Sequence, residues 1–270
     1  MSISGGDTVL GVAAREVAEA FVHARRSGRA LPAYPGTAPA DLSQAYAIQD
    51  AALALWDRPV GGWKVGRINA PDDERLGADR LAGPIFSDSI FEDLGSPRSM
   101  GVFDGGFAAA EAEFMLRIAR PAEAALPLTK QAAMEWIGEI RVGIEIASSP
   151  YPGINRDGPC VTVSDHGNNA GLVLGPRVDP SFWADLDSVE VILSIDGSEA
   201  GRASTLSMLD GPFGAARFLL ENLHRRQIEP RDGWWISSGA ITGVHEVGPG
   251  QSITADFGKL GHVSAKIDLL

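Results

Sequence analysis

The alternation of side chains in Phe107–Ile118 constrains the fold most strongly. On a β-strand successive side chains point to opposite faces, so Phe114 and Leu116 would share one face. Glu111 and Glu113 would share the other face, about 6.5–7 Å apart along the strand. Two carboxylates held this close resist joint ionisation unless water screens them or a cation lies between them. The pattern predicts a strand with either a solvated acidic face or a divalent-metal site.

A second segment, Ile140–Ile146, alternates in the same way. Its β-branched side chains would form one face, and Gly143 and Glu145 would lie on the other. The glycine leaves room for another group to approach the strand closely. Carboxylates from two neighbouring strands would supply the oxygen ligands that Mg²⁺ or Mn²⁺ prefers. Two separate solvated strand faces remain the alternative.

Composition limits the classes of partner. The chain has 270 residues, of which 44% are hydrophobic and 21% charged, as in ordinary globular proteins of one large domain or two small ones. Its net charge of −12 and the lack of a basic patch argue against a nucleic-acid partner. No apolar run approaches the ~20 residues of a membrane span and no signal-peptide core is present, so we expect no membrane partner and a cytoplasmic location.

The spacing of apolar residues predicts a mixed α+β fold with a β-rich core. Amphipathic helices are expected over 8–27 and, with Asp41 as N-cap, up to about Trp56. Two more helices are expected, one capped by Thr129 and one over 212–226. Short strands are expected at 62–65, 108–118, 140–147, 171–174, 189–195, 202–207, 234–236, 252–257 and 262–267. The last two would form a terminal hairpin that closes the sheet.

Several polar residues outside the two glutamate-bearing strands are candidates for chemistry. Lys64 lies between two apolar residues and would either bind a carboxylate or enolate or be solvated. Leu76–Asp79 and Gly83–Phe86 lie in a stretch expected to be rich in loops, where Asp79 is either an acid or base or a turn residue. The loop that starts at Asp165 suits substrate contacts or a plain turn. The segment Ser237–Ala240 could offer hydroxyl and backbone N–H groups to an anion.

Other familiar chemistries lack their motifs. The five histidines show no zinc-binding spacing, and no glycine-rich nucleotide motif or Walker lysine is present, so zinc hydrolysis and nucleotide cofactors are disfavoured. Cys160 is the single cysteine, which excludes an intrachain disulfide. We expect a structural role for this cysteine, because no base accompanies it.

Taken in order, the motifs resemble the 2-keto-4-pentenoate hydratase and 4-oxalocrotonate decarboxylase branch of the fumarylacetoacetate hydrolase-like superfamily. The resemblance covers nearly the whole chain. It runs through Ala45–Gln49, Lys64–Gly66, Leu76–Asp79, Glu111–Glu113, Glu145, Asp165–Gly171 and Ser238–Ala240.

The resemblance implies a fold, a metal and a substrate. The fold would be a β-roll, with residues 1–60 as an N-terminal helical cap and 61–270 as the catalytic region of one structural unit. The metal, Mg²⁺ or Mn²⁺, would be held by Glu111, Glu113 and Glu145. It would bind a small 2-oxo or 2-hydroxy dienoic acid and act as Lewis acid while water adds to give a 4-hydroxy-2-oxo acid.

The same resemblance implies roles for the remaining candidates. Lys64 would steady the carboxylate or enolate and Asp79 would carry a proton. Ser238, Gly239 and the loop of Asp165 would contact the substrate. A homo-oligomer is also expected from the resemblance.

Departures from the family pattern leave other functions open. The loop reads Asp165-His-Gly-Asn-Asn, where hydratases tend toward Ala-Asp-Asn-Ala-Ser, which leaves the shape of the substrate and the reaction open. Close relatives decarboxylate 4-oxalocrotonate with the same metal ligands. Distant relatives hydrolyse acylpyruvates with a His-x-x-Glu pair, and no histidine here is followed three residues later by glutamate. A partner subunit without catalytic activity is the remaining alternative.

Overall fold

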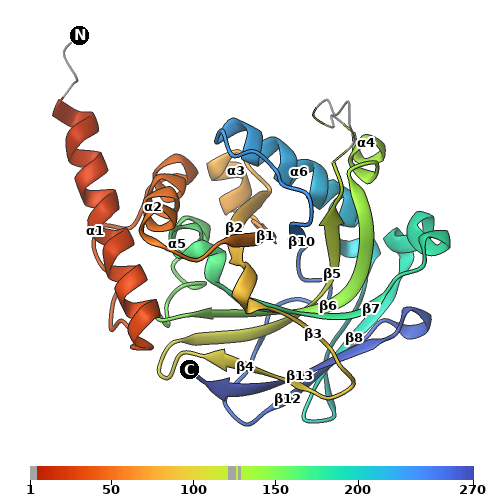
Figure 1. Ribbon diagram of the computed structural model, residues 1–270. Helices are drawn as coiled ribbons and strands as arrows, with labels where there is room; N and C mark the ends of the chain where they lie inside the picture. Colours follow the sequence, from red (N-terminus) through yellow and green to blue (C-terminus); the bar gives the residue numbers. More distant parts are fainter. Residues whose placement is uncertain (1–4, 121–125, 127–128) are drawn as a thin grey trace.

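The computed structural model describes residues 5–120, 126 and 129–270, with side chains from residue 11 onward. It has the expected α+β architecture, with two packed β-sheets and helices around them (Figure 1). The strands are β1 (Val60–Arg67), β2 (Arg80–Phe86), β3 (Ile90–Glu92), β4 (Arg98–Val102), β5 (Phe107–Ile118), β6 (Ile137–Ser149), β7 (Asn169–Arg177), β8 (Glu190–Ile195), β9 (Ser198–Ser204), β10 (Trp235–Ser237), β11 (His245–Glu246), β12 (Ser252–Asp256) and β13 (His262–Leu269).

The helices are short apart from three. The α-helices are α1 (Gly5–Ser27), α2 (Leu42–Leu55), α3 (Asp72–Leu76), α4 (Lys130–Met134), α5 (Pro159–Ser164) and α6 (Gly211–Arg225). The 3₁₀ turns are η1 (Ser87–Ser89), η2 (His166–Asn168), η3 (Pro180–Ser188), η4 (Thr205–Ser207) and η5 (Gly258–Leu260). Within the described residues, no helix combines the length and apolarity needed to cross a bilayer.

The larger sheet curls strongly, and its long strands β5 and β6 run through its centre (Figure 1). Its strand order is β2-β1-β10-β5-β6-β7-β3, with β11 paired to one end of β5. Because of the curl, β2 near one edge also contacts β7 near the other. Side chains on the inner face of β1, β5 and β6 therefore converge.

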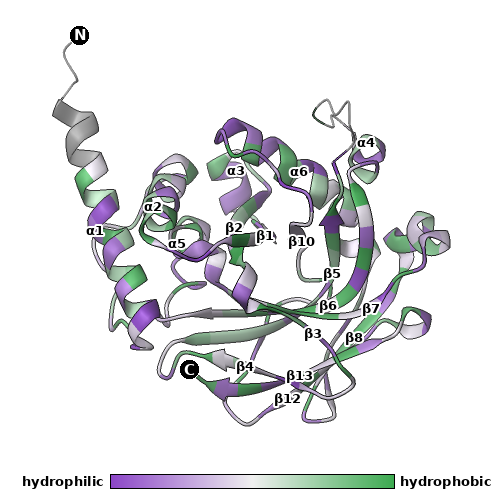
Figure 2. Cartoon of the chain, in the orientation of Figure 1, coloured by the Kyte–Doolittle hydropathy of each residue, from purple (hydrophilic) through white to green (hydrophobic). Residues whose placement is uncertain are grey.

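The main hydrophobic core lies on the outer face of this curled sheet. Alternate residues of β5 and β6, such as Phe114 and Ile144, pack there against the smaller sheet and against α6. The smaller sheet has the order β4-β13-β12-β8-β9 and contributes residues such as Val263. Figure 2 shows apolar positions along β6 and β13, as two packed sheet faces require.

The N-terminal helices pack on one end of the larger sheet. Phe21 of α1 and Ile48 of α2 form a separate apolar cluster with Phe107 at the start of β5. As predicted, the Asp41 side chain caps α2 by accepting the Gln44 N–H at 2.9 Å. The division of the chain near residue 60 stays a prediction.

Two predictions about strands are wrong. The terminal hairpin does form, with Ile253 opposite Ala265, but it lies in the smaller sheet and does not close the larger one. The predicted strand at 202–207 is displaced: β9 ends at Ser204 and the turn η4 follows. The residues that face outward in both segments are polar. The alternation of apolar and polar residues alone therefore does not define where these strands end.

The stretch around Gly83 and Pro84 was expected to be a loop and is instead the fully buried strand β2. Proline is tolerated there because β2 is at the edge of its sheet, where a missing N–H breaks no ladder. Gly83 is required because η2 packs against it: a Cβ at this position would lie 2.1 Å from the carbonyl oxygen of His166. Gly83 and Pro84 are typical of turns, but each has a structural reason to lie in this strand.

Candidate active site

Three glutamates converge on the inner face of the curled sheet. Glu111 lies directly opposite Glu145 in the β5–β6 ladder, and Glu113 lies opposite Gly143. One carboxylate oxygen from each glutamate lies within 4.8 Å of the other two. Their exposed fractions are 4% for Glu111 and 0% for Glu113 and Glu145, so the alternative of a solvated acidic face is wrong. Like charges opposite one another in a buried ladder need compensation.

Glu113 is anchored through one oxygen only. Its Oε2 accepts hydrogen bonds from the Ser237 hydroxyl at 2.5 Å and the Gly239 N–H at 2.8 Å. Its Oε1 is buried and has no hydrogen-bond partner among the described residues. A buried carboxylate oxygen without a partner is costly, so this atom points to a missing cationic partner.

Glu145 repeats this arrangement on the neighbouring strand. Its Oε1 accepts a hydrogen bond from the Asn169 side chain at 2.8 Å and lies 3.4 Å from the Lys64 Nζ. Its Oε2 is buried and also lacks a hydrogen-bond partner within the described part of the chain. In both glutamates the surroundings fix one oxygen and leave the other available. This donor set fits a hard divalent cation such as Mg²⁺ or Mn²⁺.

Lys64 supplies the positive charge that the described residues place beside the glutamates. Its side chain is buried, and its Nζ also donates to the Asn168 Oδ1 at 3.5 Å. Burial alone would lower the pKa of Lys64, but the charges of Glu145 and Glu111 outweigh burial and raise it. Lys64 is therefore a cation at neutral pH. One positive charge cannot balance three carboxylates.

The carboxylates respond to this imbalance by retaining protons. Burial raises the pKa of Glu111 to about 7, against the opposing charge of Lys64. Burial, followed by the charges of Glu145 and Glu111, raises the pKa of Glu113 well above its ordinary value. Such pKa values are typical of functional sites, because burying a carboxylate without a full counter-charge destabilises its ionised form.

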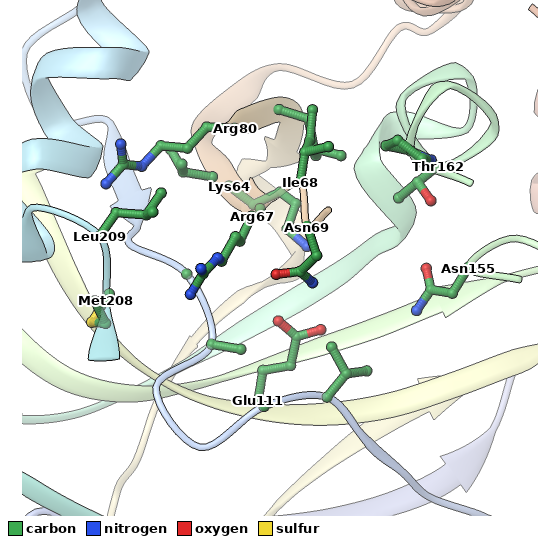
Figure 3. A pocket seen from close by; sticks show the side chains of 18 of the residues that line it. Lys64, Arg67, Ile68, Asn69, Arg80, Glu111, Asn155, Thr162, Met208 and Leu209 are labelled. Atoms are coloured by element: carbon green, nitrogen blue, oxygen red, sulfur yellow. The ribbon is translucent and has the colours of Figure 1, made fainter. Parts of the chain in front are cut away.

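A cavity of about 720 Å³ opens onto this cluster. Lys64 and Glu111 line its inner end, and the segment from Ser238 to Val244 forms one wall. Figure 3 shows Lys64, Arg67 and Asn69, from β1 and the loop that follows it, across the cavity from Glu111. Acidic and basic groups thus meet at the bottom of a pocket large enough for an organic ligand.

The structure brings most of the predicted site residues together. Glu111, Glu113, Glu145 and Lys64 form one cluster. Ser238 lines the cavity, and its hydroxyl has no hydrogen-bond partner among the described residues. Gly239 also lines the cavity, although its N–H is directed to Glu113.

Asp79 and Asp165 lie outside the cluster. The Asp79 side chain is 57% exposed and 3.7 Å from an Arg80 nitrogen, and Asp79 is not part of the cavity wall. Asp165 is completely buried, and its two oxygens accept hydrogen bonds from Arg25 at 2.5 and 2.9 Å and from Ser149 at 2.6 Å. Neither the Asp79 nor the Asp165 carboxylate therefore lines the cavity.

Sequence reasoning missed the residues that orient the glutamates. Ser237 and Asn169 hold Glu113 and Glu145, whereas the sequence predicted only that their segments would contact an anion or the substrate. Asn155 and Arg67 were also missed as cavity residues. The sequence contains a partial indication of both residues, because Asn169 lies in the polar loop that starts at Asp165 and Ser237 immediately precedes Ser238. Their partners come from other strands and only the tertiary structure identifies them.

Known proteins resemble this chain over most of its length. It is 26% identical over 259 residues to a 2-keto-4-pentenoate hydratase of Paraburkholderia xenovorans (strain LB400), which covers 94% of both chains. It is 27% identical over 123 residues, 46% of both chains, to a 4-oxalocrotonate decarboxylase of Pseudomonas putida. A search against models of protein families gave no match.

Solved structures show the same fold. The 4-oxalocrotonate decarboxylase of Pseudomonas putida G7, complexed with magnesium and adipate, superposes with a TM-score of 0.78 at 19% identity, covering 94% of this chain and 97% of that one. The fumarylpyruvate hydrolase of Pseudomonas aeruginosa, in complex with Mn²⁺ and pyruvate, gives a TM-score of 0.57 at 19% identity, covering 79% and 91%. The chain therefore shares its fold with these enzymes, and in sequence it is similar over most of its length to 2-keto-4-pentenoate hydratases and over about half of it to a 4-oxalocrotonate decarboxylase.

Proposed function

We propose that this enzyme is a divalent-metal-dependent hydratase that adds water to a 2-hydroxy-2,4-dienoate and forms a 4-hydroxy-2-oxo acid. The observation that carries the proposal is the buried cluster at the bottom of the cavity. There, Glu113 and Glu145 each keep one oxygen that accepts no hydrogen bond from the residues that the structure describes, next to the cation of Lys64. The similarity to 2-keto-4-pentenoate hydratases along 94% of the chain supports this reaction.

The metal ligands in this proposal are Glu111, Glu113 and Glu145. Their anionic oxygens suit Mg²⁺ or Mn²⁺. When bound, the ion would supply Lewis-acid stabilisation of negative charge on a 2-oxo or 2-hydroxy acid. Ser237 and Asn169 fix the outer oxygens of two of these glutamates, so that the inner oxygens are pre-oriented.

Lys64 has an electrostatic role. Because its pKa is raised, it stays protonated at neutral pH and donates hydrogen bonds instead of acting as a base. Its position beside Glu145 places a fixed positive charge where the carboxylate or enolate of the substrate would lie. The free hydroxyl of Ser238 is a candidate donor to the same ligand. Asp79 has no place in this arrangement, because its side chain lies outside the cavity wall.

The proposal is tested by product analysis. Purified protein is incubated with Mg²⁺ and 2-hydroxypenta-2,4-dienoate, and the products are identified by NMR. We expect 4-hydroxy-2-oxopentanoate to form, and we expect Glu113→Gln to abolish this activity. Glu246→Gln, on the exposed part of β11, is the matched control and retains activity. Absence of turnover by the wild-type protein with Mg²⁺ and with Mn²⁺ would contradict the proposal.

Decarboxylation of a 4-oxalocrotonate-type acid is the second candidate. The superposition with a 4-oxalocrotonate decarboxylase over 94% of this chain favours it, because stabilised enolate charge serves both reactions. Incubation with 2-hydroxyhexa-2,4-dienedioate separates the two. Release of CO₂ supports decarboxylation, and water addition without CO₂ supports the hydratase.

A further inference from the structure

The cavity is much larger than a five-carbon acid requires. Its volume of about 720 Å³ lies in the range of sites that enclose drug-sized ligands. The carboxylate cluster and Lys64 occupy its inner end. At the outer end the lining includes Leu209 and Val244, whose exposed fractions are 43% and 50%. Apolar side chains in the lining of a pocket are suited to pack against the carbon chain of a ligand. The outer half of the cavity therefore fits a substrate tail.

A basic side chain also faces this outer half. Arg67 is the last residue of β1 and lines the cavity, where its Nη1 donates to the Ser207 carbonyl oxygen at 3.3 Å (Figure 3). Two other arginines line the cavity, but Arg80 is paired with Asp210, and Arg156 with Asp157. Among the described residues, Arg67 has no carboxylate partner, so its charge is available to a ligand.

Lys64 and Arg67 are both on β1 and flank the cavity from its inner to its outer end. The rise of a strand places their Cα atoms about 10 Å apart. Lys64 faces the carboxylates, whereas Arg67 extends past them to η4. A ligand held at the cluster by its 2-oxo acid group would therefore extend its tail toward the Arg67 guanidinium. Guanidinium groups bind carboxylates strongly, because two N–H donors match two oxygens.

We propose that Arg67 is a specificity-determining residue that binds a second carboxylate at the far end of the substrate. The natural substrate is then a 2-hydroxy-dienoate with an acidic tail, and not the unbranched five-carbon acid. This inference rests on the proposed function for the reaction at the inner end. The site for the second carboxylate is inferred from the size of the cavity and from the position of Arg67.

The test compares two seven-carbon substrates that differ only in the tail. With Mg²⁺, we expect kcat/KM for 2-hydroxyhepta-2,4-dienedioate to exceed that for 2-hydroxyhepta-2,4-dienoate by at least about 10-fold, the effect of one charge-assisted hydrogen-bonded contact. Arg67→Met should reduce kcat/KM for the diacid by about 10- to 100-fold, mainly through KM. It should change the value for 2-hydroxypenta-2,4-dienoate by less than about twofold. Arg67→Lys should retain part of the preference.

Arg29→Met is the matched control, because Arg29 is exposed and does not line the cavity. This variant should leave both substrates unaffected. Equal kcat/KM of the wild type for the two tails would overturn the proposal. An equal loss for both tails in Arg67→Met would overturn it as well. If the six-carbon 2-hydroxyhexa-2,4-dienedioate instead releases CO₂ with the same dependence on Arg67, the subsite stands and the hydratase proposal fails.

A binding experiment covers the case of an enzyme that turns over none of these acids. Calorimetric titration with Mg²⁺ present compares 2-oxoadipate with 2-oxohexanoate, which differ only in the terminal carboxylate. Tighter binding of 2-oxoadipate that is lost in Arg67→Met supports the subsite although the proposed reaction fails. Equal binding of the two acids, or binding of neither, overturns the subsite.

Discussion

Arg25 and Asp165 form a buried, two-pronged ion pair that joins helix α1 to the loop beside the carboxylate cluster. Two guanidinium nitrogens of Arg25 donate to the two Asp165 oxygens at 2.5 and 2.9 Å. Arg25 also donates to the carbonyl oxygen of Asn169 at 3.1 Å, and the Asn169 side chain holds Glu145. Asp165, expected to contact substrate, instead fixes the loop that positions a glutamate. Burial opposes its ionisation, yet Arg25 and His166 lower the pKa of Asp165 to about 2.

The first prediction concerns this ion pair. Arg25→Met leaves the Asp165 carboxylate buried without its partner and should lower the free energy of unfolding by about 3–5 kcal/mol. Adding Asp165→Asn should recover part of this loss, because the uncompensated charge is removed. Urea denaturation monitored by tryptophan fluorescence measures both. Arg29→Met, at an exposed position, is expected within about 0.5 kcal/mol of wild type. A loss below about 1 kcal/mol in Arg25→Met would show that the pair is not important for stability.

A second prediction concerns the pH dependence of the metal-free protein. The pKa values of Glu111 and Glu113 are raised in the folded state, so folding favours their protonated forms. For Glu111, the stability that this provides is complete below the unfolded pKa of about 4.5 and is lost as pH rises through about 7. The loss for Glu111 is up to about 3 kcal/mol. Burial lowers the pKa of His166, which contributes in the opposite direction over the same pH range. In EDTA, the difference in melting temperature between the wild type and Glu111→Gln should therefore change in disfavour of the wild type between pH 5 and pH 8.

Mg²⁺ should reverse this trend, because the ion competes with protons for the same oxygens. The increase in melting temperature on adding Mg²⁺ should be larger at pH 8 than at pH 5.5. Differential scanning fluorimetry with Glu111→Gln as comparison isolates this contribution. The same pH dependence of the melting temperature in wild type and Glu111→Gln in EDTA, or a Mg²⁺ effect independent of pH, is incompatible with the pKa of Glu111.

The third prediction concerns Ser237, whose hydroxyl donates to Glu113. Ser237→Ala should weaken metal binding by about 10-fold or more, since partners that orient a ligand typically contribute 10- to 100-fold to affinity. Ser252→Ala is the control, because this exposed serine in β12 lies in the other sheet. Mn²⁺ binding measured by electron paramagnetic resonance gives the affinities. Equal affinities of the two variants would mean that Glu113 needs no support from Ser237.

The fourth prediction concerns Gly143, directly opposite Glu113. A Cβ there would lie 2.6 Å from the Met115 side chain and 3.0 Å from the Val173 carbonyl oxygen. Gly143→Ala should therefore cost about 1–3 kcal/mol through overpacking. Gly11→Ala, in α1 and with no atom within 4 Å of the new Cβ, should be neutral or slightly stabilising. Urea denaturation would contradict the packing argument if both substitutions had the same effect.

The carboxylate cluster was largely predictable from the sequence. The two-residue period of β5 and β6 places Glu111, Glu113 and Glu145 on one kind of face, and the two strands are adjacent in the chain and in the sheet. The pattern left open whether that face is solvated. The curl of the sheet decides this, because it brings Lys64 of β1 to the glutamates and β2 to β7, contacts between segments distant in sequence.

The supporting residues were not predictable in the same way. Asp165 binds Arg25, 140 residues away in the sequence, so an inspection of its loop suggests a substrate contact and not an ion pair. Strand β2 was missed because Gly83 and Pro84 are typical of turns, whereas here one accommodates a neighbouring backbone and the other lies at a sheet edge. Local patterns carry no information on these contacts.

The central claim is that Glu111, Glu113 and Glu145 form a divalent-metal site. Isothermal titration calorimetry of the EDTA-treated and dialysed protein with Mn²⁺ at pH 8 tests this claim most directly. The account predicts one ion per chain for the wild type and the Glu246→Gln control. It predicts at least about 100-fold weaker binding for Glu145→Gln, which removes an anionic ligand with a free oxygen. Unchanged Mn²⁺ affinity and stoichiometry in Glu145→Gln would contradict the account.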